Sequence, residues 1–181
     1  MERSEIRGDH QLFPGCALLH PGHYSLMEPH RLRRWRIRAG PATPFYTCAR
    51  PGRSKGAGGR VSDKDLNAWV EGLPAKQNVV IVSLLGWKPD GTSEYSFYGF
   101  HEHGHSWQEW LDRIHPGSKI CVMEFPTTDF QKVPQDVLDA VAEALRRLVS
   151  EKKVVILVDS GGETRTKQVC KFVEAVEDFA S

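Results

Sequence analysis

The segment best suited to chemistry is a glycine-rich junction between an apolar run and a helical pattern. The apolar run 154–158 leads into Asp159, and the loop continues to Thr166. In this geometry backbone N–H groups and a helix N-terminus point at one spot, which favours an anion. Arg165 follows six positions after Asp159 and could clamp an oxyanion with two parallel hydrogen bonds. We therefore expect an anion site formed by the following loop residues: Ser160, Gly161, Gly162, Glu163, Thr164, Arg165 and Thr166.

The loop resembles the phosphate-binding loop of the dual-specificity and tyrosine phosphatases, whose pattern is His-Cys-x5-Arg-Ser/Thr. Gly162, Arg165 and Thr166 fall on that family's glycine, arginine and hydroxyl positions. The segment Ala49-Arg50-Pro51-Gly52 also fits the start of that fold. The likeness covers roughly residues 43–180. It implies a dual-specificity phosphatase-like α/β domain with a phosphate site at this loop.

A second segment, from Glu124 to Phe130 and followed by Pro134, looks like the general-acid loop of these phosphatases. The resemblance implies that Asp129 takes the position of the acid that protonates the leaving group. A structural interpretation stays open, because an acidic residue in a turn before a proline-started helix is common without catalysis. Arg165, likewise, could be a structural clamp paired with Asp159.

Three departures from the family pattern affect function more than the matches do. Asp159 stands where the family has its nucleophilic cysteine, and Val158 stands where the family has histidine. The chain also stops one helix after the loop, at Ser181, whereas the family usually continues through further helices. We therefore expect a C-terminally truncated version of the fold, with apolar surface left on the last helix.

An aspartate at the nucleophile position changes both reactivity and binding. Family chemistry needs a thiolate with a lowered pKa, whereas a carboxylate could attack phosphorus only to form an acyl phosphate. Folds that use that route normally add a magnesium site, and the sequence shows no matching ligand set near the loop. An incoming phosphate would also meet a like charge about 4 Å away, worth up to about 4 kcal/mol at an effective dielectric near 20. The hypothesis is a loop that fills its own anion site, without a cofactor.

Apolar periodicity predicts the elements that hold this loop. Nearly all-apolar runs predict buried strands, and capping and helical patterns predict helices between them. The predicted strands are 45–49, 79–85, 120–125 and 154–158, and the predicted helices are 62–71, 106–114, 134–149 and 164–179. Strands that alternate with helices indicate an α/β domain with a central, mainly parallel sheet flanked by helices.

Composition limits the class of protein. The chain has 181 residues, of which 40% are hydrophobic and 26% charged, as in an ordinary globular domain. No apolar run is long enough to span a membrane, and the first residues lack the apolar stretch of a secretory signal. The 4 cysteines lie far apart with no CxxC, which fits a reducing compartment. We expect a cytoplasmic protein, with a mitochondrial location as the alternative.

The charge is divided unevenly along the chain. Residues 1–60 hold 11 Lys and Arg against 4 Asp and Glu, and residues 61–181 hold 13 against 19. Residues 1–44 contain five prolines and little periodicity, which predicts a basic irregular extension before a domain over 45–181. Its arginine cluster could meet nucleic-acid phosphates or an acidic partner, or could fold back on the acidic body. The cluster consists of Arg31, Arg33, Arg34, Arg36 and Arg38.

A histidine pattern precedes the helix predicted at 106–114. If this segment is extended, His101, His103 and His105 point to one side, as zinc ligands would. The sequence offers no fourth ligand, so a polar loop with three separate imidazoles is the favoured interpretation and no metal is expected.

Three functions remain open. The first is a catalytically inactive phosphatase-fold protein that acts as a binding or structural subunit in a larger assembly. The second is a dual-specificity or tyrosine phosphatase, a phosphomonoester hydrolase, with its nucleophile position occupied by Asp159. The third is an RNA-associated protein that binds through the basic arm.

Overall fold

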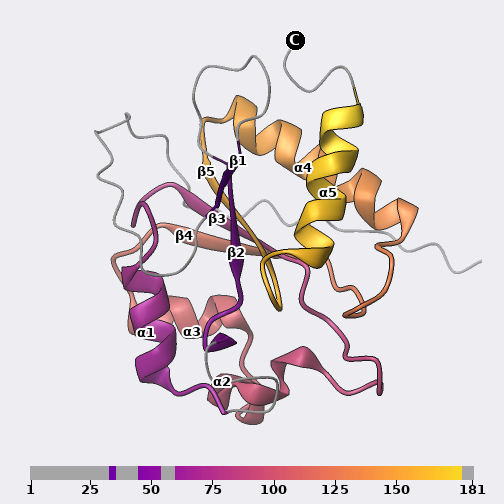
Figure 1. Cartoon of the computed structure of the whole chain (residues 1–181). Coiled ribbons are helices and arrows are strands. Elements are labelled where there is room, and N and C mark those ends of the chain that lie inside the picture. The colour runs from indigo at the N-terminus through magenta and orange to yellow at the C-terminus, as the bar shows by residue number, and fades with distance from the viewer. Residues whose placement is uncertain (1–32, 36–44, 54–59, 177–181) are drawn as a thin grey trace, which may run out of the picture.

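A five-stranded sheet lies at the centre of the described chain (Figure 1). The computed structural model describes residues 33–35, 45–53 and 60–176. The strands are β1 Arg33–Trp35, β2 Phe45–Ala49, β3 Val79–Ser83, β4 Ile120–Glu124 and β5 Val154–Asp159. They lie in the order β1-β2-β5-β3-β4. Strands β2, β5, β3 and β4 are parallel, and β1 pairs antiparallel with β2.

Helices cover both faces of the sheet (Figure 1). The long helices are α1 Asp63–Glu71, α3 Trp107–Ile114, α4 Gln135–Ser150 and α5 Thr164–Ala175. Alternation along β5 divides the core, because successive side chains of a strand point to opposite faces. Ile156 and Val158 pack with α1 and α3, whereas Val155 and Leu157 pack with α4 and α5. The all-apolar run 154–158 is therefore a strand buried on both faces.

Two capping boxes start α1 and α3, as the sequence predicts. The Ser62 hydroxyl accepts the Asp65 N–H at 3.3 Å, and the Asp65 carboxylate accepts the Ser62 N–H at 2.9 Å. The same reciprocal pair joins Ser106 and Glu109, at 3.2 and 2.7 Å. These bonds satisfy N–H groups that the helix itself leaves unpaired.

The parallel strands bring several loops to one edge of the sheet. The chain leaves β2 at Arg50, β3 at Leu84 and β5 at Asp159, and all three strands end on the same side. Backbone bonds join these exits: the Arg50 N–H donates to the Asp159 carbonyl at 2.9 Å, and the Leu84 N–H donates to the Val158 carbonyl at 2.8 Å. Ligand sites of open α/β sheets lie at this carboxyl edge.

The predicted fold class, an α/β domain with a mainly parallel sheet and flanking helices, is confirmed. The differences are local. The strand expected over 79–85 ends at Ser83, and the helix expected to reach 179 is described to Ala175. Two short helices were not predicted, the 3-10 helix η2 Glu94–Phe97 and α2 Gly99–Glu102.

The sheet also uses residues from the segment that the sequence assigns to an irregular extension. Strand β1 pairs Arg33 with Thr47 and Trp35 with Phe45, so three residues of that segment belong to the sheet. The rest of 1–44 lies outside the described residues. Within the part of the chain that the structure describes, no helix has the length and apolar character needed to cross a membrane.

Candidate functional site

The glycine-rich loop joins the end of β5 to the start of α5, as predicted. Asp159 is the last residue of β5 and its side chain is buried, with 1% of the residue exposed. The loop passes tightly over β2 at Gly162, which has φ +70°. A Cβ at Gly162 would lie 2.5 Å from the Ala49 backbone nitrogen, so only glycine allows this approach.

The Asp159 carboxylate occupies the centre of the loop and accepts four backbone N–H groups. Its Oδ1 accepts the N–H of Gly161 at 2.9 Å, of Glu163 at 3.3 Å and, in a shorter contact, of Gly162. Its Oδ2 accepts the N–H of Thr166 at 2.9 Å. A helix N-terminus attracts an anion at such a place, and here a side chain of the chain itself supplies the anion.

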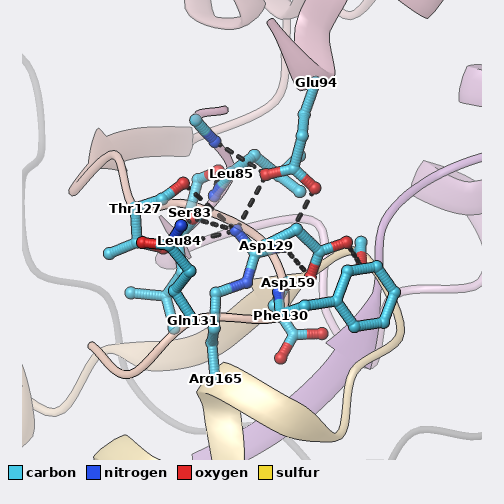
Figure 2. A network of polar contacts seen from close by, with 12 residues as sticks. Ser83, Leu84, Leu85, Glu94, Thr127, Asp129, Phe130, Gln131, Asp159 and Arg165 are labelled. Atoms are coloured by element: carbon cyan, nitrogen blue, oxygen red, sulfur yellow. Dashed lines mark hydrogen bonds and ion pairs between the residues drawn. The ribbon is translucent and has the colours of Figure 1, made fainter. Parts of the chain in front are cut away.

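Arg165 is fully buried and points away from the Asp159 carboxylate, toward a second acid (Figure 2). Its two terminal nitrogens contact both oxygens of Glu94, Nη1 with Oε2 at 2.8 Å and Nη2 with Oε1 at 2.9 Å. Nη1 also donates to the Leu84 carbonyl at 2.9 Å. Burial lowers the pKa of Arg165, but the hydrogen bonds and charge of Glu94, helped by Asp129 and Asp159, outweigh burial and raise it. The guanidinium is therefore firmly charged and held in place.

Asp129, from the loop after β4, contacts the glycine-rich loop and the Arg165 guanidinium. One carboxylate oxygen lies 3.1 Å from Arg165 Nη2, and the other accepts the Ser160 hydroxyl at 2.8 Å. The Asp129 N–H donates to the Trp87 carbonyl at 2.8 Å, which fixes the segment over the loop. Asp129 thus links the loop after β4 to the loop after β5.

Glu94 is the part of this site that sequence reasoning missed. It is buried at the start of η2, and its Oε2 also accepts the Gly86 N–H at 2.9 Å. No apolar periodicity marks a carboxylate in the polar stretch 90–94 as buried. The sequence does show a glycine, Gly86, directly after the apolar run 79–85. In the structure a Cβ at Gly86 would lie 2.6 Å from the Thr127 carbonyl oxygen, so glycine lets these two loops approach.

Three carboxylates act on the charge of the Arg165 guanidinium. Glu94 and Asp159 are buried and Asp129 is half-buried, and the charges of all three carboxylates help to raise the pKa of Arg165. Two further buried atoms of the loop, Arg165 Nε and Thr166 Oγ1, have no hydrogen-bond partner. The loop amides converge on one position, as in an oxyanion site. The Asp159 carboxylate already accepts these amides, and its negative charge would oppose a phosphate.

The described cysteines do not supply a replacement nucleophile. Burial raises the pKa of Cys48 to about 12 and that of Cys170 to about 12. A thiol with such a pKa is hardly ionised at neutral pH, and the thiolate is the reactive form. Cys121, on β4, is half-buried.

The structure brings some of the predicted site residues together and separates others. Ser160 and Arg165 both contact Asp129, and the Asp159 carboxylate binds the loop amides, whereas Thr164 is exposed. The segment 101–105 is not extended, because His101 lies in α2 and His103 ends it. Over residues 45–53 and 60–176, no three His, Cys, Asp or Glu side chains gather to hold a metal. Of the arginine cluster, Arg33 and Arg34 are placed at the backbone level in β1, and the others lie outside the described residues.

Comparison with protein-family models, with curated proteins and with solved structures found no match for this chain.

Proposed function

We propose that the chain is a non-hydrolysing binding subunit built on a dual-specificity phosphatase-like fold. One observation supports this proposal above the others: the Asp159 carboxylate accepts four loop N–H groups. In a phosphatase of the resembled family these groups are available to the substrate's phosphate. Here the Asp159 carboxylate already accepts these N–H groups, and position 159 has no thiolate that could attack phosphorus.

The arrangement of Arg165 supports the same proposal. Both terminal nitrogens of its guanidinium engage Glu94, and one also faces Asp129. An arginine that is held in this way stabilises the loop and has few donors left for a ligand. The network is therefore better suited to keep a rigid surface at the sheet edge than to turn over a substrate.

A phosphatase with a substituted nucleophile is the second candidate, and the position of Asp129 favours it. Its carboxylate lies over the loop, within 2.8 Å of the Ser160 hydroxyl. An acid placed there could protonate a leaving group if a thiolate stood at position 159. The RNA-binding alternative depends on the arginine cluster, and it stays a prediction.

Hydrolysis of an aryl phosphate tests both candidates. The full chain and the Val158→His/Asp159→Cys double variant are assayed side by side with p-nitrophenyl phosphate. We expect no turnover by the parent chain. Adding Asp129→Asn to the double variant serves as the matched control, because it removes the acid and leaves the thiol.

The outcomes separate the candidates. Turnover by the parent chain contradicts the proposed non-hydrolysing role. Turnover by the double variant alone, reduced by Asp129→Asn, supports a binding subunit that retains the geometry of a phosphatase. If neither protein hydrolyses the substrate, the result supports a binding role in which the site has diverged beyond positions 158 and 159.

A further inference from the structure

One edge of the central sheet has no strand beside it among the described residues. Strand β4 pairs with β3 on one side and is the last strand in the order of the sheet (Figure 1). The apolar surface expected on the last helix, by contrast, is not found among the described residues, because Val169 and Val173 of α5 are buried and Phe172 is half-buried. The unpartnered part of the described fold is therefore a backbone edge.

The backbone groups of β4 divide between the two sides of the strand. The Lys119 carbonyl and the Phe125 N–H form hydrogen bonds with β3, at 3.2 and 2.8 Å. Because these groups alternate along a strand, the N–H and C=O groups of Ile120, Val122 and Glu124 point away from β3. Backbone groups at an open edge form a template on which another strand can pair.

One side chain of α3 already occupies part of this edge. Gln108 Oε1 accepts the Val122 N–H at 2.7 Å, and Gln108 Nε2 donates to the Ile120 carbonyl at 3.1 Å. The same Nε2 donates to Asp112 Oδ1 at 2.9 Å, which orients the amide. An amide that accepts one backbone N–H and donates to the carbonyl two positions earlier makes the bonds that a neighbouring strand would make. Gln108 therefore stands in the place of such a strand.

The position of Gln108 on α3 explains how its side chain reaches the edge. Trp107, Trp110 and Leu111 are the buried residues of this helix, which packs against β4. Gln108 is half-buried and lies at the border of that buried face. Replacing Gln108 by alanine thus removes no buried apolar side chain, and alanine is a good helix former. We expect the fold to survive this substitution.

The register of β4 favours a second copy of the chain as the strand that Gln108 excludes. Two identical strands related by a two-fold axis supply the same groups to each other in an antiparallel pair. A pair centred on Val122 sets Glu124 opposite Ile120, so no like charges meet, but it needs the N–H that Gln108 occupies. A pair centred on Glu124 leaves Gln108 in place, but it sets two carboxylates directly opposite each other, which is destabilising.

We propose that the open edge of β4 is a pairing site for a second copy of this chain, in an antiparallel arrangement centred on Val122, and that Gln108 blocks this site in the single chain. The inference goes beyond the proposed binding role, and it does not depend on the glycine-rich loop. Displacement of the Gln108 amide from β4 is the step that decides whether two sheets join across this edge.

Sedimentation equilibrium of the purified full chain and of two matched variants tests this proposal. The test variant is Gln108→Ala. The control is Gln135→Ala, which breaks the corresponding bond on α4, from Gln135 Nε2 to Asp139 Oδ1 at 3.1 Å. We expect the dimer dissociation constant of Gln108→Ala to fall at least about tenfold below that of the parent, because two backbone groups become available for pairing. Gln135→Ala should match the parent.

A second substitution and a second measurement locate the contact. Added to Gln108→Ala, Glu124→Pro removes an outward N–H that the pairing needs, at an edge position where proline is tolerated, and should restore the behaviour of the parent. Glu124→Gln keeps that N–H and should leave the dimer in place. In the Gln108→Ala dimer, amide hydrogen exchange at Val122 and Glu124 should be slower than in the same variant at dilution.

Several outcomes overturn the proposal. These are sedimentation of Gln108→Ala like the parent, an equal rise in association in Gln135→Ala, and a dimer whose amide exchange at β4 is unchanged. Thermal unfolding checks that each variant is folded. A Gln108→Ala chain that does not fold also overturns the proposal, because Gln108 would then hold the fold together rather than block an edge. No phosphate ester is used, so failure here is distinct from failure of the non-hydrolysing role.

Discussion

Arg165 and Glu94 form a buried, two-contact ion pair between residues 71 positions apart in sequence. Arg165 lies in the first turn of α5, and Glu94 begins η2 in the loop after β3. The pair therefore ties the two loops that flank the candidate site. Because Glu94 also accepts the Gly86 N–H, it connects three segments of the sheet edge through one carboxylate.

Removing the Glu94 carboxylate should destabilise the fold strongly. Glu94→Ala leaves the Arg165 guanidinium buried without its main partner, which typically costs about 3–5 kcal/mol. Urea unfolding followed by circular dichroism gives the free energy of unfolding.

The matched control is Glu102→Ala, which breaks the exposed pair with Arg60 at 2.6 Å and should cost under about 1 kcal/mol. Equal losses in the two variants would contradict a structural role for the buried pair.

Two neighbouring glycines should respond very differently to substitution. Gly162→Ala places a side chain at φ +70° and 2.5 Å from the Ala49 nitrogen, so we expect a loss of at least about 2 kcal/mol in stability. Gly161→Ala meets nothing within 4 Å and should stay within about 0.5 kcal/mol of the parent. Thermal unfolding of the two variants checks the order, and a larger loss for Gly161→Ala would contradict the close approach of Gly162 to β2.

The sequence predicts the strands and the loop of this site better than the hydrogen bonds and ion pairs between its side chains. The runs 79–85 and 154–158 predict strands because continuous apolar residues are typical of strands buried on both faces. Glycine and strand signals likewise place the loop after β5. The partners of Arg165 were not predictable, because Glu94 is brought to it by tertiary folding across 71 positions. A pairing of Arg165 with Asp159 was the local alternative, but the amides of the loop use that carboxylate.

Stability should fall in alkaline solution. Burial raises the pKa of Cys48, Cys170 and Tyr98 to about 12 each, above their ordinary values of 9.0 for the thiols and 10.0 for the phenol. As pH rises above about 9, the unfolded chain loses these protons first and is favoured. Each thiol should then lower the free energy of unfolding by about 1.4 kcal/mol per pH unit until its folded pKa is reached.

Urea unfolding at a series of pH values measures this slope. The Cys48→Ala/Cys170→Ala variant should show a flatter decline, because the tyrosine contribution remains and the thiol contribution is gone. Identical slopes for the parent and the variant between neutral pH and about pH 11 would show that these thiols are not buried as described.

Removing the Asp159 carboxylate should turn a filled loop into one that binds an oxyanion. Asp159→Ala frees the N–H groups of Gly161, Gly162, Glu163 and Thr166, and leaving them unpaired should cost about 3 kcal/mol or more in stability. Phosphate or sulfate can then occupy the same position, so millimolar sulfate should raise the melting temperature of the variant by several degrees through binding to the folded state.

The parent chain should show no such response, because sulfate would meet the Asp159 charge, a penalty of up to about 4 kcal/mol. Asp159→Asn is the matched control: its amide oxygen can still accept the N–H groups of Gly161 and Gly162, so the loop stays filled without the charge. Chloride at equal ionic strength corrects for general salt effects. A sulfate response in the parent as large as that in Asp159→Ala would mean that the carboxylate does not block the anion position.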